Sequence, residues 1–284
     1  MWAARAIWVL LPLAIGPAVA GALDGRSGLV RAVAMALLWL GWGAVFVGLL
    51  LPTTTSLTVV RTTVPLALVV AVVAWCTGAS WPRGLLAVTG AVLALLVTFS
   101  AELGRRFAQG TAYGDESRFL LRPPVALLLP VGLAWSLLAG AAVAGPLLVG
   151  AKVWVVGTIV TLLAIGGGLV LGPRFHALSR RWLVLVPAGL VVHDVVVLAE
   201  TVMVGRAAVA GLALALDGTE AADVSGPAAG AAIELRLNSL IDVVLSATRT
   251  DPGGRKLHAR AVLVRPSRPG GALADAARRG YPVG

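Results

Sequence analysis

The chain has 284 residues, of which 58% are hydrophobic and only 13% charged, and its mean hydropathy is +0.93. Because soluble domains carry about 25% charged residues, this composition excludes a wholly soluble protein. The net charge of +10 accompanies the cytoplasmic Arg and Lys that orient membrane proteins, so we expect no nucleic acid partner. The single cysteine, Cys76, excludes disulfides, zinc fingers and iron–sulfur clusters.

Six segments are apolar and long enough to cross a bilayer, which takes roughly 17 to 25 residues. They are residues 6–23, 29–51, 63–80, 84–101, 124–144 and 147–172. Short links separate them, among them Pro52 to Thr62 and Gly145-Pro146. The first segment contains Ala18-Val19-Ala20 and is either a transmembrane helix or a cleaved signal peptide. None of the six has an Asp, Glu or Arg in its middle, so we do not expect coupled transport by this chain alone.

The basic residues in the links predict the orientation. With the amino terminus inside, nine basic residues are cytoplasmic and four lie outside, a bias that fits the positive-inside rule. The nine are Arg5, Arg61, Arg105, Arg106, Arg118, Arg122, Arg174, Arg180 and Arg181, and the four are Arg26, Arg31, Arg83 and Lys152. We therefore expect a multi-pass protein of the plasma membrane with a cytoplasmic C-terminus.

The link from Glu102 to Pro123 is the longest connection in the membrane half. Its charged side chains could form a contact surface for a partner, since loops often carry function, or could anchor the orientation of the helices. The candidate contact residues are Arg105, Arg106, Asp115, Glu116, Arg118 and Arg122.

Of the 23 basic and 13 acidic residues, 22 lie from Arg174 onward, which separates a transmembrane domain at 1–175 from a β-rich domain at 176–284. Runs typical of strands cover residues 182–187, 190–194, 198–204, 209–216, 232–237, 243–248 and 259–264. Turn-forming stretches, such as Asp251-Pro252-Gly253-Gly254, separate them, and residues 271–279 have the composition of a helix. This pattern predicts a small barrel or sandwich that ends in a helix.

The tail of this domain is basic. It is either a solvated face or a contact surface for anionic lipid headgroups, which attract each well-placed cation by about 1 kcal/mol. The candidate residues are Arg255, Lys256, Arg260, Arg265 and Arg268, with Arg278 and Arg279 nearby.

Residues 180–194, Arg-Arg-Trp-Leu-Val-Leu-Val-Pro-Ala-Gly-Leu-Val-Val-His-Asp, resemble the opening of a bacterial pleckstrin-homology-like (PH-like) domain. Residues 262–270 and the Ala-rich stretch after them resemble the closing strand and helix of that fold. The whole chain is similar to uncharacterised actinobacterial polytopic membrane proteins of this size. The resemblance implies a fold and a binding role, and it transfers no catalytic residue.

Site chemistry gives no further function. His176, His193 and His258 match no metal-ligand spacing, and the chain has no nucleophile elbow, phosphate loop or dinucleotide fingerprint. We expect no cofactor and no enzyme activity. The sequence favours a membrane adaptor or regulatory subunit that presents its cytoplasmic domain to a membrane or cytoplasmic protein, or to anionic lipid. The alternative is a permease-like transporter component with a regulatory domain.

Overall fold

A computed structural model describes residues 1–247 and 253–284, and the chain divides into two compact units. Unit 1 comprises Met1–Phe107 and Val131–Phe175, and unit 2 comprises Ala108–Pro130 and His176–Gly284. The chain therefore passes between the units three times. Residues 108–130, which the sequence analysis assigned to the transmembrane domain, belong to the unit that also holds residues 176–284.

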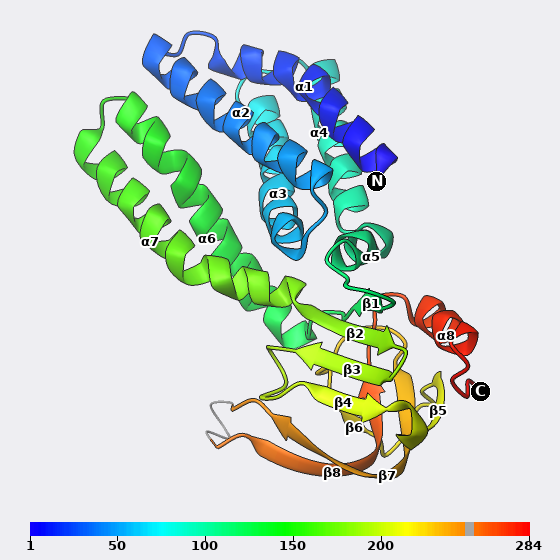
Figure 1. Ribbon diagram of the computed structural model, residues 1–284. Coiled ribbons are helices and arrows are strands. Elements are labelled where there is room, and N and C mark those ends of the chain that lie inside the picture. The colour runs from blue at the N-terminus through cyan, green and yellow to red at the C-terminus, as the bar shows by residue number, and fades with distance from the viewer. Residues whose placement is uncertain (248–252) are drawn as a thin grey trace. The chain divides into compact units, whose positions relative to one another are not determined.

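Six long apolar helices confirm the predicted helical part of the chain (Figure 1). They are α1 (Trp2–Leu23), α2 (Gly28–Leu50), α3 (Thr54–Cys76), α4 (Trp81–Thr98), α6 (Val125–Gly150) and α7 (Trp154–Ser179). Each is long and apolar enough to cross a membrane. A short helix, α5 (Ala101–Gln109), occupies the first part of the link that was expected to be a loop.

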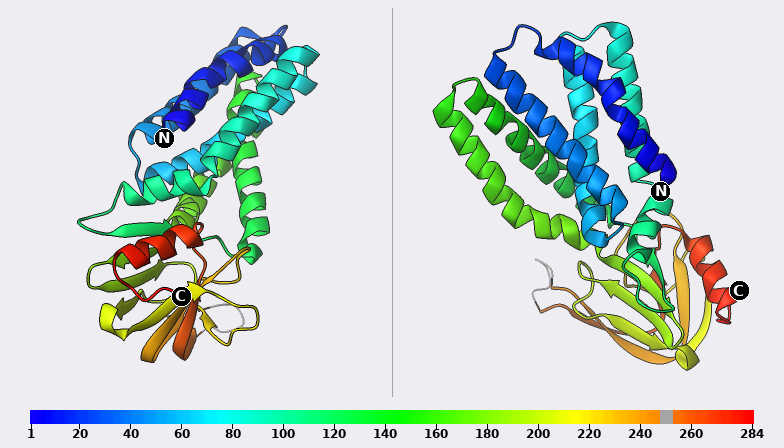
Figure 2. Two further views of the ribbon diagram at one scale, coloured as in Figure 1. Left: turned by 90° about the vertical axis from the view of Figure 1, so that its right-hand side faces the viewer. Right: turned by 45° about the horizontal axis from the view of Figure 1, so that its top comes forward.

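Helices α1 to α4 pack through small residues and two tryptophans. α4 packs against both α1 and α3 (Figure 2), and its buried face carries Gly84, Ala87, Ala91 and Ala94, which lets the helix backbones approach closely. Between α1 and α2, Trp8 Nε1 donates to the Trp42 carbonyl at 2.9 Å and Trp42 Nε1 donates to the Trp8 carbonyl at 3.0 Å. These reciprocal bonds satisfy both indole donors within the apolar bundle.

Helix α3 begins at Thr54, well before residue 63, where the apolar pattern begins. The Thr53 side chain caps the helix by accepting from Ser56 N at 3.1 Å. Within the first turns, the Thr58 hydroxyl donates to the Thr54 carbonyl and the Thr62 hydroxyl to the Thr58 carbonyl. Because these hydroxyls are satisfied by their own helix, a polar sequence extends the span. Arg61 therefore lies inside α3 and not in a link, contrary to our prediction.

The link between the last two long helices is residues 151–153 and not Gly145-Pro146, which lies within α6. Gly145 is small because α7 approaches it closely: a Cβ there would lie 2.5 Å from Thr161 Oγ1. Gly157 of α7 has the same role, since its Cβ would lie 2.6 Å from Val149 N. The turn itself is made by Lys152, whose φ of 65° places it in the left-handed region.

Unit 2 contains two four-stranded sheets and one helix. The first sheet has the order β1-β2-β3-β4 and is antiparallel throughout, and the second has the order β5-β7-β8-β6. The strands are β1 (Ser117–Leu120), β2 (Arg181–Val186), β3 (Gly189–Asp194), β4 (Val202–Gly205), β5 (Val209–Leu214), β6 (Ala222–Asp223), β7 (Ile233–Leu245) and β8 (Arg255–Val264). A 3-10 turn, η1 (Arg206–Ala208), joins β4 to β5, and α8 (Pro269–Arg278) follows β8.

The predicted β-rich region and C-terminal helix are thus confirmed, although the strands differ from the predicted runs. β6 was not predicted, and the run expected at 198–204 is a strand only from Val202 to Gly205. β1 comes from the link before α6 and pairs with β2, so that Ser117 lies opposite Leu185 and Leu120 opposite Trp182. The two strand runs expected at 232–237 and 243–248 form one strand, β7, whose register shifts between Arg236 and Ile241. Thr248, at the end of the second run, and the first half of the turn at 251–254 lie outside the described residues.

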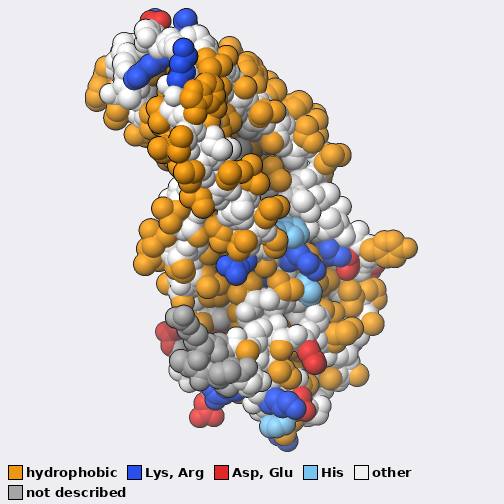
Figure 3. Space-filling view, turned by 90° about the vertical axis from the view of Figure 1, so that its left-hand side faces the viewer, with side chains coloured by type: hydrophobic (Ala, Val, Ile, Leu, Met, Phe, Trp, Pro, Cys, Tyr) orange, Lys and Arg blue, Asp and Glu red, His pale blue; other side chains and the backbone are white. Residues whose placement is uncertain are grey.

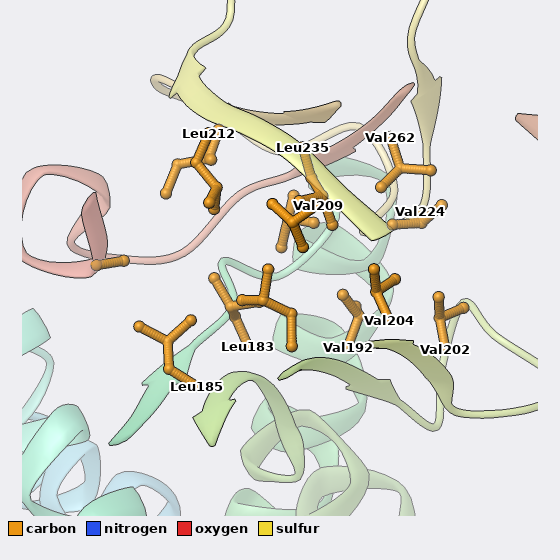
Figure 4. Close-up of a cluster of buried hydrophobic side chains, with 14 of the residues drawn as sticks. Leu183, Leu185, Val192, Val202, Val204, Val209, Leu212, Val224, Leu235 and Val262 are labelled. Carbon is orange, nitrogen blue, oxygen red and sulfur yellow. The ribbon is translucent and has the colours of Figure 1, made fainter. Parts of the chain in front are cut away.

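The core of unit 2 lies between the two sheets, where alternate residues of each strand face inward (Figure 4). Leu183, Leu185 and Val192 from the first sheet face Leu235 and Val262 from the second (Figure 4). Ala272, Ala276 and Tyr281 belong to the same cluster. Helix α8 therefore contributes to the core.

Candidate functional site

Unit 2 contains an ion pair between Arg181 and Asp194, whose side chains are both fully buried. Arg181 donates to both carboxylate oxygens, from Nε at 2.8 Å and from Nη2 at 2.7 Å. Its remaining contacts are the carbonyls of Arg122 at 2.9 Å and Ser225 at 2.6 Å. Since every contact is internal, this pair holds segments of unit 2 together and offers no surface to a ligand.

Three of the predicted contact arginines are also engaged within unit 2. Arg118 pairs with Glu116 at 2.6 Å and lies 5.1 Å from the centre of the Trp182 ring. Arg122 donates to the Ala229 carbonyl at 2.6 Å. Arg265 pairs with Asp223, and its backbone N–H donates to the Ser225 hydroxyl. These side chains stabilise the domain, and their cationic groups are already matched.

The remaining predicted residues outside the hairpin have local partners or cap an element. Asp115 is exposed and accepts from Arg279 at 2.9 Å, which connects the segment before β1 to the end of α8. On α5, Glu102 pairs with Arg106 at 2.8 Å and lies 3.7 Å from Arg105. Such half-exposed pairs on one helix face contribute little to stability. Arg268 is exposed at the N-cap of α8.

The exposed cations of the predicted set gather on the hairpin formed by β7 and β8. Arg255, Lys256 and Arg260 are exposed, and none forms an ion pair with an acid among residues 1–247 and 253–284. His258, between them, contacts exposed Asp242 of β7, with 2.5 Å between Nδ1 and Oδ1. We call residues 241–245 and 255–260 the basic hairpin. It is the part of the predicted surface that remains available to a partner.

Hydrogen bonds place the basic hairpin at a defined end of unit 2. Its β7 strand pairs with the segment after β3, because Ala199 N donates to the Val244 carbonyl at 2.9 Å and Ser246 N donates to the Val197 carbonyl at 2.8 Å. That segment follows Asp194, which lies opposite Arg181, the first residue of β2. The chain enters β2 from α7 with one residue, Arg180, between them. The hairpin thus lies at the end of unit 2 where the chain arrives from the last long helix.

A second cluster, which the sequence analysis did not detect, lies on the first sheet. His193 stacks on Trp182 with ring centres 5.4 Å apart, and its Nδ1 lies 3.0 Å from the Thr201 hydroxyl. Its Nε2 is buried and has no hydrogen-bond partner among the described residues. Burial and the positive charges of Arg180 and Arg118 lower the pKa of His193, although Asp194 acts in the opposite direction. Trp182 and His193 lie opposite each other because β2 and β3 pair in the register set by the short turn at residues 187–188.

Charged and apolar side chains are distributed unevenly over the surface. On the face drawn in Figure 3, hydrophobic side chains cover most of the helical unit, while charged side chains and histidines lie among hydrophobic ones on the β unit and near the helix ends. Among residues 1–247 and 253–284, no three His, Cys, Asp or Glu side chains are grouped as metal ligands would be.

Comparison of the chain with models of protein families, with curated proteins and with solved structures gives no match. The function is therefore inferred from the geometry of each of the two units.

Proposed function

We propose that the protein is a non-enzymatic integral membrane adaptor or regulatory subunit of the plasma membrane. Its helices anchor a cytoplasmic PH-like domain, which binds a protein or the headgroups of inner-leaflet lipids. The observation that carries the proposal is the discontinuous construction of unit 2 from 108–130 and 176–284. A domain tied into the chain at three points is suited to transmit a binding event to the helices.

The link from β1 to α6 supports this role. Leu121 N donates to the Arg181 carbonyl and Arg122 N donates to the Arg265 carbonyl, both at 2.9 Å. At the start of α6, Val125 N donates to the Pro227 carbonyl at 2.8 Å. The first turn of this helix is therefore held by unit 2. A ligand that prefers one arrangement of this segment would shift the population of helix arrangements by its difference in affinity.

The PH-like assignment is supported by the arrangement of the strands. Unit 2 has an antiparallel four-stranded sheet facing a second sheet, and its C-terminal helix packs into the core. The basic hairpin gives such a domain an exposed cationic surface, which suits an acidic protein partner or anionic headgroups. The cytoplasmic location rests on the bias of Arg and Lys toward one set of links.

The test is crosslinking in native membranes, followed by affinity purification and mass spectrometry of proteins and lipids. The full-length chain is compared with Arg255→Gln/Lys256→Gln/Arg260→Gln. The matched control, Arg26→Gln/Arg31→Gln/Arg83→Gln, removes three exposed arginines of unit 1 and changes the net charge equally. We expect loss of a specific partner with the hairpin variant only. Equal recovery with all three chains would contradict a role for the hairpin, and the absence of any specific partner would contradict the adaptor.

A permease-like component remains the second proposal, because unit 1 contains a groove of about 330 Å³. Its lining includes two threonines, Thr58 and Thr62, but is otherwise apolar, with Trp135, Leu138 and Phe175 among its residues. The Thr62 carbonyl already accepts from Trp135 Nε1 at 2.8 Å. Flux of small polar solutes into proteoliposomes, reduced by Thr62→Val, would support this second proposal over the adaptor.

A further inference from the structure

Arg61 is a half-buried cation within the membrane-spanning part of unit 1. It is the eighth residue of α3, so its Cα lies about 10 Å along the helix from the first residue. Its Nε is buried and has no hydrogen-bond partner among the described residues. A charge at such a position is costly unless it is paired, and for this reason it marks a functional site by default.

Unit 1 has no acid to neutralise Arg61. Its two acids are Asp24, which follows α1, and Glu102 of α5, which pairs with Arg105 and Arg106. The contact of the Arg61 guanidinium is instead an aromatic ring, that of Phe99, with 5.6 Å between Cζ and the ring centre. By comparison, Arg5 of α1 donates from its Nε to the Leu49 carbonyl at 3.1 Å. Arg61 is thus a cation whose Nε donor has no hydrogen-bond partner among the described residues.

The contact with Phe99 shows where the guanidinium points. Phe99 is the C-cap of α4, so the Arg61 side chain extends to the level at which this helix ends. Long side chains near helix ends carry their charge to the membrane interface in this way. Helix α5 starts two residues after Phe99, and its Arg105 is another residue whose buried Nε lacks a hydrogen-bond partner among the described residues. This end of unit 1 therefore combines three arginines with one acid, Glu102, and two of the arginines have an Nε without a hydrogen-bond partner among the described residues.

We propose that Arg61 binds the phosphate of an anionic glycerophospholipid at the α3–α4 end of unit 1, with Arg105 adding to the positive field. A guanidinium presents parallel N–H donors that match two phosphate oxygens, and the pairing is strongest where water is scarce. The phosphate supplies the negative charge that the chain lacks at this point. The site lies in unit 1 and does not depend on the proposed role of unit 2, because none of its residues belongs to the basic hairpin.

The test measures thermal unfolding of the full-length, delipidated protein in detergent during titration with phosphatidylglycerol, phosphatidylcholine or inorganic phosphate. The variants are Arg61→Gln and Arg61→Lys, and the control is Arg31→Gln, which removes an exposed arginine of α2. We expect phosphatidylglycerol to raise the Tm of the native chain and of the control. Arg61→Gln should need about tenfold more lipid for the same shift, since it loses one charge-assisted bond. Arg61→Lys should fall between them, because it keeps the charge without the planar fork.

The most decisive result would be a reversal, between phosphatidylcholine and phosphatidylglycerol, of which chain unfolds at the higher temperature. In phosphatidylcholine alone, Arg61→Gln should unfold at a higher temperature than the native chain, because it removes a half-buried charge that forms no ion pair among the described residues. In phosphatidylglycerol the order should reverse. Identical titrations for the native chain and Arg61→Gln would overturn the proposal. Equal stabilisation by inorganic phosphate would overturn the lipid as the source of the anion. If Arg61→Gln unfolds too readily for titration, native mass spectrometry of its folded fraction should show loss of the retained anionic lipid, and unchanged retention would overturn the proposal.

Discussion

At the scale of single residues, burial distinguishes ion pairs that stabilise the fold from ion pairs that contribute little to its stability. Arg181 and Asp194 are both 0% exposed, whereas His258 and Asp242 of the basic hairpin are 68% and 74% exposed. A buried pair is costly to break because the remaining partner stays charged in a medium of low polarity. An exposed pair is screened by water and contributes little.

Asp194→Asn should therefore destabilise the protein by about 3–5 kcal/mol, since it leaves the Arg181 charge uncompensated. The loss should appear as a lowered Tm of the full-length protein in detergent. The control, Asp242→Asn, removes an exposed partner, and its effect should stay within about 0.5 kcal/mol. Equal effects of the two variants would show that the buried pair is not a structural centre.

The lowered pKa of His193 predicts how the stability of the protein depends on pH. Burial, with Arg180 and Arg118, lowers its pKa below the ordinary value of 6.5, so the unfolded chain takes up a proton that the folded chain does not. This contribution to stability is fully present above pH 6.5 and is lost as the pH falls below it. His193→Asn should flatten the dependence of Tm on pH between pH 7 and the acid range. An unchanged slope would exclude His193 as its source.

At the scale of elements, β1 is the part of unit 2 that lies farthest from its partners in the sequence. It has four residues, and Phe119, within it, is 3% exposed in the core of a domain whose other strands begin at Arg181. Tyr113, which precedes β1 in the link between α5 and β1, is 92% exposed. Truncation of the chain after Arg181 would therefore remove the strand with which β1 pairs. It would destabilise residues 108–130 as well as delete most of residues 176–284.

Phe119→Ala should destabilise unit 2 by about 3–5 kcal/mol, the usual effect of removing a buried ring. Hydrogen exchange should then show faster exchange of the β2 and β3 amides, although two long helices, α6 and α7, lie between them and the substituted residue in the sequence. Tyr113→Ala is the control and should leave their exchange unchanged. Protection of β2 and β3 that is insensitive to Phe119→Ala would show that β1 is dispensable.

At the scale of the whole molecule, two features give the protein its architecture: six apolar helices and a β unit assembled from two chain segments. Few side chains of these helices are buried within the chain, as is typical of helices whose apolar surfaces face lipid. The orientation that we propose rests on the bias of Arg and Lys toward one set of links. Unit 2 and the link after α1 should thus lie on opposite sides of the membrane.

Thiol labelling of intact cells tests this orientation. In a Cys76→Ser background, a cysteine at exposed Arg26 should react with a membrane-impermeant reagent in intact cells. A cysteine at exposed Ser239 of β7 should react only after the cells are permeabilised. Labelling of both positions in intact cells would place unit 2 outside and remove the basis for an inner-leaflet partner.

The sequence by itself determined the number of long helices, the β character of the region after Arg181 and the helix at the end of the chain. Each depends on local composition or on a short hydrophobic period, which a single segment carries without help from the rest. The same logic failed at Arg61, because threonine hydroxyls that bond within their own helix extended α3 into polar sequence.

Only the tertiary structure decided which of these basic residues are matched within the described part of the chain. Arg118, Arg122 and Arg265 look the same in the sequence as Arg255, Lys256 and Arg260, yet the first three are matched by acids or carbonyls and the second three form an exposed surface. Contacts between distant segments make this distinction for Arg122 and Arg265, as they do for the pairing of β1 with β2. Such contacts join residues far apart in the chain, so neither segment specifies its partner by its own sequence pattern.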